Sequence, residues 1–203
     1  MNRRDALTLL AAAGLISGCA VTETSDGATE AVDLVEMVQI PGGHAATSSR
    51  HGPFEQQNGC ASGFTHDSIG AAVAATHIGA RVTAAAGPEI AMATIAAQCW
   101  GDLAGARRRL GAQLPLPATL PQPEYAPVAL WFRVLAGDPT GEQVVVSLLA
   151  DTPQSRAAGG LARVDATLRW SGDDWQLRVP TARASVHPST DGYELLAPTG
   201  IPT

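Results

Sequence analysis

The sequence predicts an α+β domain, in which two to three N-terminal helices pack on one face of a curved antiparallel sheet of about four strands. Two observations predict this class. Alanine-rich stretches with helical spacing occupy residues 68–112, and stretches rich in valine, leucine and tryptophan occupy residues 125–179. A helical half followed by strands joined through short turns indicates helices layered on an antiparallel sheet.

A short first strand is predicted at residues 32–40, ended by Pro41-Gly42-Gly43. Its apolar residues would share one face of the strand: Val32, Leu34, Val38 and Ile40. The chain over residues 42–63 is rich in Gly, Ser, His, Gln and Asn. This composition predicts a loop.

The clearest helix is predicted at residues 68–85, which are rich in alanine and free of proline. Thr65 or Asp67 is its candidate N-cap, and Gly87-Pro88 ends it. A second helix would begin at Pro88, because proline fits the first helical turn. Its buried stripe would consist of Met92, Ile95, Cys99 and Leu103.

A third helix would follow, with Asp102 as its N-cap and an end near Ala112. Arg107-Arg108-Arg109 lie near that end, where positive charge is favourable, and could touch lipid headgroups or simply be solvated. Four prolines within residues 114–123 then predict a stiff connector.

Two strands are predicted at residues 125–136 and 143–150, with a turn at 137–141 between them. The apolar run at 144–149 indicates a central strand covered on both faces. In the tail over residues 182–203, Tyr193-Glu194-Leu195-Leu196 is the one strand-like segment.

The last hairpin has the strongest structural signal, because one register places every large apolar residue on one face. With Gly172-Asp173 as the turn, the apolar pairs are Trp170–Trp175, Leu168–Leu177 and Ala166–Val179. The polar pairs on the other face are Arg169–Gln176 and Thr167–Arg178. One face is therefore expected in the core, and the other in water or against a partner. Helices lying across such a sheet resemble the cystatin-like or nuclear-transport-factor-2-like fold, which implies a cone.

The N-terminus predicts export and a lipid anchor. Asn2-Arg3-Arg4 precedes an apolar stretch at residues 6–15, which is shorter than the about 20 residues of a membrane span. Ile16-Ser17-Gly18-Cys19 resembles the lipobox of bacterial lipoproteins, which implies cleavage before Cys19 and lipid on its sulfur. An ordinary signal peptide with a chance cysteine is the alternative, and the paired arginines leave export by the general or the twin-arginine route open.

These features divide the chain into four parts. We expect a signal peptide at 1–18, a lipidated flexible tether at 19–31, a single α+β domain at 32–198 and a tail at 199–203. The formal charge is −6, and loss of Arg3, Arg4 and Asp5 with the signal peptide would make it −7. An acidic chain without a basic run is a poor nucleic-acid binder.

Two cysteines remain in the expected domain, Cys60 and Cys99. In an oxidising compartment they could form a disulfide, worth roughly 3–4 kcal/mol in the chain-entropy model. Alternatively, Cys99 is a small buried helical residue and Cys60 a loop thiol. The sequence leaves both interpretations open.

No catalytic or metal-binding motif stands out. The chain has five histidines, but they lack the tight pairs typical of zinc sites, so no metal and no cofactor are expected. Ser68 lies two residues after His66, a spacing that helix capping explains. Asp165 could be a base within a pocket, although cross-strand pairing with Arg163, Arg169 or Arg178 is the plainer interpretation.

Two segments carry a resemblance to a known family. Residues 63–72 read Gly-Phe-Thr-His-Asp-Ser-Ile-Gly-Ala-Ala, and residues 169–175 read Arg-Trp-Ser-Gly-Asp-Asp-Trp. Their order, with Pro41 and Gly52-Pro53 upstream, resembles an uncharacterised actinobacterial family of secreted proteins and lipoproteins over about 150 residues. Here Asp67-Ser68 replaces a usual Thr-Pro, and one extra residue lengthens the last turn.

Members of that family often accompany conjugative-element genes, which implies a role in a cell-envelope transfer apparatus. The resemblance carries over no catalytic residue. We therefore expect an extracytoplasmic lipoprotein, anchored to the cell membrane through Cys19, that is a non-enzymatic assembly or binding component of an envelope complex. Its expected contact or pocket residues are Phe64, His66, Asp67, Asp165 and Arg169.

Two alternatives remain from the sequence. One is a cone whose small apolar pocket binds a ligand or catalyses a reaction, with His66 and Asp165 converging on it. The other is an immunity or exclusion lipoprotein, which the sequence does not distinguish from the assembly role.

Overall fold

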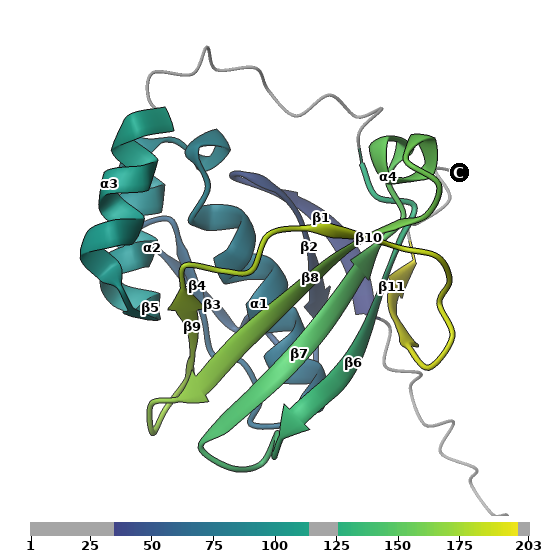
Figure 1. The fold of residues 1–203 in the computed structure, drawn as a ribbon. Coiled ribbons are helices and arrows are strands. Elements are labelled where there is room, and N and C mark those ends of the chain that lie inside the picture. The colour runs from purple at the N-terminus through teal and green to yellow at the C-terminus, as the bar shows by residue number, and fades with distance from the viewer. Residues whose placement is uncertain (1–34, 114–125, 199–203) are drawn as a thin grey trace, which may run out of the picture. The chain divides into compact units, whose positions relative to one another are not determined.

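The computed structural model describes residues 35–113 and 126–198, all within a compact unit that spans Val32–Thr203. The described part is α+β, with four helices and a seven-stranded mixed sheet that does not close (Figure 1). The predicted class is thus confirmed, whereas the predicted purely antiparallel sheet of about four strands is wrong. The predicted signal peptide, Cys19, tether, connector and tail lie outside the described residues.

The large sheet has the strand order β11-β6-β7-β8-β9-β5, and β10 pairs with β8. Its strands are β5 (Cys99–Gly101), β6 (Ala129–Gly137), β7 (Gln143–Ala150), β8 (Leu161–Trp170), β9 (Trp175–Val179), β10 (Ser185–His187) and β11 (Glu194–Pro198). Neighbouring strands are antiparallel except β5, which runs parallel to β9 and makes the sheet mixed.

Two small antiparallel ribbons lie within residues 35–62. Their first strand falls in the strand predicted at residues 32–40, and the other three fall in the segment for which a loop was predicted. The ribbons pair β1 (Val35–Ile40) with β2 (Gly43–Ser48), and β3 (Glu55–Gln57) with β4 (Cys60–Ser62). The loop prediction failed because small and polar residues make up β2, β3 and β4, so no apolar alternation indicates them. In β1, Val35 and Met37 pack on the core, rather than the even-numbered face that was predicted, although Ile40 is buried.

The helices are α1 (Ser68–Arg81), α2 (Pro88–Gln98), α3 (Leu103–Gln113) and α4 (Pro153–Ala157). A 3₁₀ turn at Ala84–Ala86 separates α1 from α2. The helices are not all N-terminal, because α4 lies between β7 and β8. Thr152 and Ser155 form its capping box. This helix was not predicted, because its signal is short and lies between two apolar strands.

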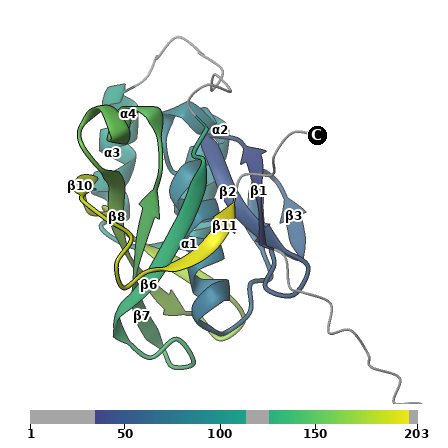
Figure 2. The same cartoon turned by 90° about the vertical axis from the view of Figure 1, so that its right-hand side faces the viewer.

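Helix α1 lies between the β1–β2 ribbon and the large sheet (Figure 2). Both layers contact it, and accordingly every residue from Gly70 to Ile78 is buried. Alanine and glycine dominate this stretch, and their small side chains let the two layers approach the helix closely. The main core therefore forms between α1 and the inner face of β6–β9.

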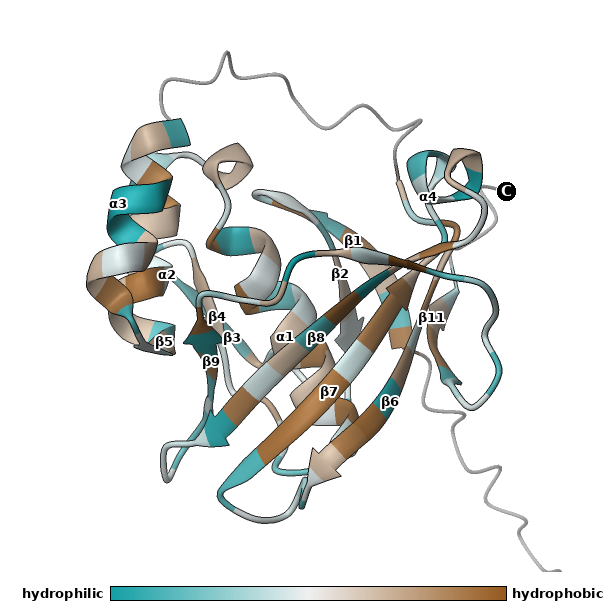
Figure 3. Ribbon diagram, in the orientation of Figure 1, coloured by the Kyte–Doolittle hydropathy of each residue, from teal (hydrophilic) through white to brown (hydrophobic). Residues whose placement is uncertain are grey.

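The register of the last hairpin, the central strand and the start of α3 follow the predictions. The hairpin β8–β9 pairs Leu168 with Leu177, Arg169 with Gln176 and Trp170 with Trp175, as predicted. Strand β7 is central and hydrophobic along most of its length (Figure 3). Asp102 Oδ1 accepts the N–H of Gly105 (2.8 Å) at the start of α3.

Within α2, the predicted buried stripe is correct at Ile95 and wrong at Met92. Ala91, Thr94, Ile95 and Gln98 are buried, whereas Met92 is 40% exposed. Cys99 belongs to β5 rather than to the helix. The buried side chains of α2 face β4 and α1, which both contact the helix.

Candidate functional site

The start of α1 is attached to the β8–β9 turn through a set of residues that we call the latch. The latch consists of Gly63, Phe64, Thr65, His66, Trp170, Asp174 and Trp175. His66 stacks on Trp170, with ring centroids 4.0 Å apart and an interplanar angle of 6°. The His66 ring also meets the edge of Trp175 at 5.2 Å, and its Nε2 lies 2.8 Å from the carbonyl oxygen of Gly141.

Asp174 and Trp175 complete the latch with hydrogen bonds to backbone. The Asp174 carboxylate accepts the N–H groups of Gly63 (2.9 Å) and Phe64 (3.2 Å), and Trp175 Nε1 donates to the carbonyl of Thr65 (2.9 Å). Burial raises the pKa of Asp174, although these backbone donors lower it in part. The two segments that carry the resemblance, residues 63–72 and 169–175, therefore touch each other, and their contact holds the helix start to the sheet.

Asp67 is the N-cap of α1, as one of the two predicted candidates. Its Oδ1 accepts the N–H of Gly70 at 2.7 Å, and its Oδ2 lies 3.1 Å from His51 Nδ1. Burial opposes ionisation of Asp67, but the Gly70, Thr65 and His51 contacts outweigh it and lower its pKa. Phe64 is buried in the main core. The predicted contact residues Phe64, His66 and Asp67 are thus engaged in structural contacts.

The face of the sheet that points away from α1 is here called the outer face; Figure 1 shows it toward the viewer, with α1 behind. Since side chains alternate along strands, its residues are those between the core positions of β6–β9. Its charged residues are Arg133, Arg163, Arg169 and Arg178, against Asp165 as the one carboxylate among the described strand residues of this face.

One part of the outer face carries a group that we call the Arg–Trp cluster: Trp100, Arg169, Gln176 and Arg178. The guanidinium carbons of Arg169 and Arg178 lie 5.0 Å and 5.6 Å from the centre of the Trp100 ring. Arg169 Nε and Nη2 both donate to Gln176 Oε1, at 3.0 and 2.8 Å. Trp100 Nε1 donates to the carbonyl of Gln176 (3.2 Å). Two guanidinium groups therefore lie over one aromatic ring, and Gln176 holds Arg169 in place.

A second part of the outer face is occupied by internal contacts. Asp165 pairs with Arg163 (2.8 Å) and accepts the hydroxyl of Ser147, which also lies 2.9 Å from Tyr193 Oη. Burial would raise the pKa of Asp165, but the hydrogen bonds from Arg163 and Ser147 outweigh it and lower that pKa. Asp165 is thus a paired carboxylate, although the sequence had suggested a cross-strand partner and Arg163 lies on the same strand.

The structure does not bring His66 and Asp165 together. His66 stacks on Trp170, which packs on the core together with Ala166 and Leu168. Asp165 is odd-numbered on the same strand, so its side chain points to the outer face. A cavity of about 340 Å³ between α1 and the sheet is lined by neither residue. The version of the pocket hypothesis that relies on this pair has no support in the geometry.

Cys60 and Cys99 are both free thiols in the structure. Cys60 Sγ lies 3.8 Å from Thr94 Oγ1, whereas Cys99 is buried, and burial raises the pKa of Cys99 to about 12. Their pairing in an oxidising compartment stays a prediction. Within residues 35–113 and 126–198, no group of three or more His, Cys, Asp or Glu side chains is arranged to hold a metal ion.

Of the Arg–Trp cluster, only Arg169 was a predicted contact residue; Gln176 and Arg178 were predicted on the polar face of the last hairpin, and Trp100 was missed altogether. Trp100 was not predicted as a site residue, because β5 has only three residues and follows a helix directly. Its pairing with β9 was the missing information.

In the described part of the chain, no helix has the length and apolar character needed to cross a membrane.

Comparison with known proteins gives a family but no function. Residues 8–194 match the family model described as Domain of unknown function (DUF8175). No curated protein and no solved structure matches the chain.

Proposed function

We propose that this chain, which belongs to the DUF8175 family, is an extracytoplasmic lipoprotein that binds a protein of a cell-envelope complex through its Arg–Trp cluster. The role is assembly or binding rather than catalysis. The resemblance noted from the sequence supports a complex of the conjugation or secretion type.

The observation that carries the proposal is the placement of Arg169 and Arg178 over the Trp100 ring on the outer face. Tryptophan and arginine are the residues most enriched among the energetically dominant positions of protein interfaces. Arg169 is held by Gln176, so little side-chain freedom is lost when a partner binds. The cluster is therefore ready for contact without rearrangement.

The charge of the outer face indicates the chemistry of the partner. Arg163 is neutralised by Asp165, but no carboxylate in the described part of the chain forms an ion pair with Arg169 or Arg178. The whole chain is acidic, with a formal charge of −6, so this positive patch is a local exception. An acidic protein surface complements it and would approach it selectively.

The location is part of the same proposal. Lipid on Cys19 would anchor the protein to the cell membrane, because two acyl chains hold a protein there stably. We also propose that α1 and the curved sheet form a cystatin-like or nuclear-transport-factor-2-like arrangement, which the packing of α1 on the inner face supports.

Cross-linking in the native host, followed by mass spectrometry of the proteins recovered with the chain, tests this proposal. Wild type is compared with Arg169→Glu/Arg178→Glu, which reverses the charge of the cluster. Arg107→Glu/Arg108→Glu is the matched control, because it makes the same charge change on the exposed surface of α3. Cys19→Ser tests the need for the anchor.

We expect wild type and the α3 control to recover the same envelope proteins, and the cluster variant to lose them. Recovery of the same proteins by the cluster variant would refute the assigned surface. Recovery of the membrane-bound chain alone by wild type would refute the assembly role itself.

A further inference from the structure

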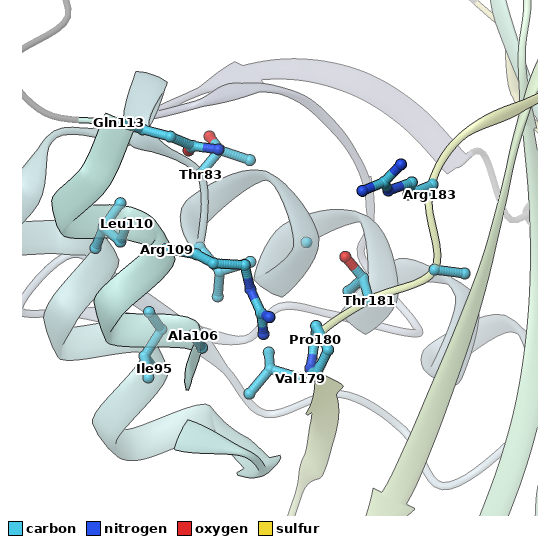
Figure 4. A pocket seen from close by; sticks show the side chains of 13 residues that line it. Thr83, Ile95, Ala106, Arg109, Leu110, Gln113, Val179, Pro180, Thr181 and Arg183 are labelled. Carbon is cyan, nitrogen blue, oxygen red and sulfur yellow. The ribbon is translucent and has the colours of Figure 1, made fainter. Parts of the chain in front are cut away.

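A cavity of about 470 Å³ lies between α3, the end of α1 and the chain that follows β9 (Figure 4). Its floor is apolar and includes Ile95, Leu110 and Val179. Arg109 reaches into it from α3, and Arg183 extends toward it from the opposite side. Neither arginine belongs to the outer face, so this cavity is separate from the Arg–Trp cluster.

The two arginines have no partner within the described residues. No hydrogen bond or ion pair to Arg109 or Arg183 exists in residues 35–113 and 126–198, and the lining of the cavity contains no aspartate or glutamate. The hydroxyls of Thr83 and Thr181 lie at the same cavity. Two unneutralised guanidinium groups with nearby hydroxyl donors form an arrangement that suits a carboxylate or phosphate group.

The cavity of about 340 Å³ between α1 and the sheet adjoins this charged cavity. Four residues line both: Gly79, Thr83, Thr181 and Ala182. Most of the remaining walls are small or aliphatic, among them Ala80, Leu148, Ala162 and Val164. His44 is the one titratable side chain in this lining, and burial lowers its pKa, so it is uncharged at neutral pH.

We propose that the two adjoining cavities bind an anionic amphiphile with a single alkyl chain. Its acidic headgroup lies between Arg109 and Arg183, and its chain extends between α1 and the sheet. Each cavity lies within the usual volume range of small-molecule sites, roughly 300–1,000 Å³. The apolar cavity exists because alanine and glycine stand where larger side chains would fill it.

Three probes separate the two halves of the proposed site: dodecanoate, dodecyl phosphate and dodecanol. Each is titrated calorimetrically, below its micellar concentration, into the full chain carrying Cys19→Ser. We expect either or both anions to bind at least about tenfold more tightly than dodecanol, since charge-assisted hydrogen bonds contribute this much. The stronger anion then identifies the headgroup as carboxylate or phosphate.

Variants test each half. Arg109→Gln/Arg183→Gln should weaken the anions about tenfold and leave dodecanol unchanged, whereas Arg107→Gln/Arg108→Gln on the same helix should change nothing. Ala162→Leu, or Ala80→Leu on the opposite wall, should weaken all three probes by filling the apolar cavity. Arg169→Glu/Arg178→Glu should leave binding intact, which separates this site from the proposed partner surface.

Three results would each overturn the proposal. The first is that neither anion binds, and the second is that dodecanol binds as tightly as the anions. The third is that the Arg109→Gln/Arg183→Gln variant binds the anions as tightly as the unsubstituted site does.

Discussion

His77 lies at the centre of the protein with no exposed surface. Its Nε2 is 2.8 Å from the carbonyl oxygen of Ala46, so Nε2 donates, and Nδ1 accepts a hydrogen bond from Arg81 Nη1 (2.8 Å). Burial, and then the charge of Arg81, lower the pKa of His77 to about 4. The folded protein thus holds a neutral histidine beside a buried guanidinium.

This geometry predicts acid sensitivity in a defined range. The unfolded chain binds a proton at His77 near pH 6.5 and the folded chain near pH 4. The contribution of neutral His77 to the free energy of unfolding is therefore fully present above pH 6.5 and is lost as the pH drops toward 4. The shift corresponds to about 3 kcal/mol. His77→Gln removes the titratable group. The free energy of unfolding in urea should therefore change less between pH 7 and pH 4 for the variant than for wild type. Equal pH dependence in both proteins would contradict the assignment.

Asp67 gives a second prediction at this scale. Asp67→Ala removes the cap of α1 and should lower the free energy of unfolding by about 1 kcal/mol. Asp67→Asn keeps the capping oxygen and should lose much less at pH 7. Because the folded pKa of Asp67 is lowered, its contribution is present at neutral pH and is lost as the pH falls below its ordinary value of 3.8. Urea titrations at pH 7 and below pH 3.8 would measure this loss in wild type, and the Asn variant should not lose stability in this way.

At the scale of the element, α1 is enclosed by two layers, and its two glycines differ in surroundings. A Cβ at Gly70 would meet the carbonyl oxygen of Thr65, whereas a Cβ at Gly79 would meet no atom within 4 Å. Gly79→Ala should therefore stabilise the protein by about 0.5–1 kcal/mol through helix propensity. Gly70→Ala should destabilise it by about 1–3 kcal/mol, because backbone must move. Thermal unfolding measures both, and equal effects would refute the packing described.

The latch joins two elements and predicts an energetic coupling. Single and double alanine variants of His66 and Trp170 should show a coupling of about 0.5–1.5 kcal/mol in the free energy of unfolding. A cycle of His66 with Trp131, which lies on β6 near the other end of the sheet, should be additive. A similar coupling in both cycles would mean that the stacked pair contributes nothing specific.

The elements that the sequence predicts correctly are those whose signals are local. The β8–β9 register follows from the alternation of residues 166–179, and the start of α1 follows from Asp67. Strands β2 and β5 were missed because their identity depends on partners distant in sequence: β2 packs on α1, and β5 pairs with β9. Short strands of small residues carry no periodicity of their own.

At the scale of the whole molecule, the same distinction applies to the candidate sites. Arg169 was predicted because it alternates with core residues within one hairpin. Trp100, Arg109 and Arg183 come from β5, α3 and the segment after β9, and only the fold brings each to its cluster or cavity. Sequence patterns therefore identify residues that share one face of an element, whereas the tertiary arrangement identifies the residues from other elements that complete the cluster or cavity.

The proposed lipid anchor on Cys19 determines where the whole chain is located in the cell. The described fold lies within the unit Val32–Thr203, whereas Cys19 precedes it. Cys19→Ser should therefore move the protein from the membrane fraction to the soluble fraction without changing its urea midpoint. Cys60→Ser, an equal substitution within the fold, should leave it in the membrane fraction. Cys19→Ser protein that still sediments with membranes after a carbonate wash would refute lipid attachment at Cys19. A shifted midpoint would instead show that the N-terminal segment contributes to folding, so the two readings together separate location from stability.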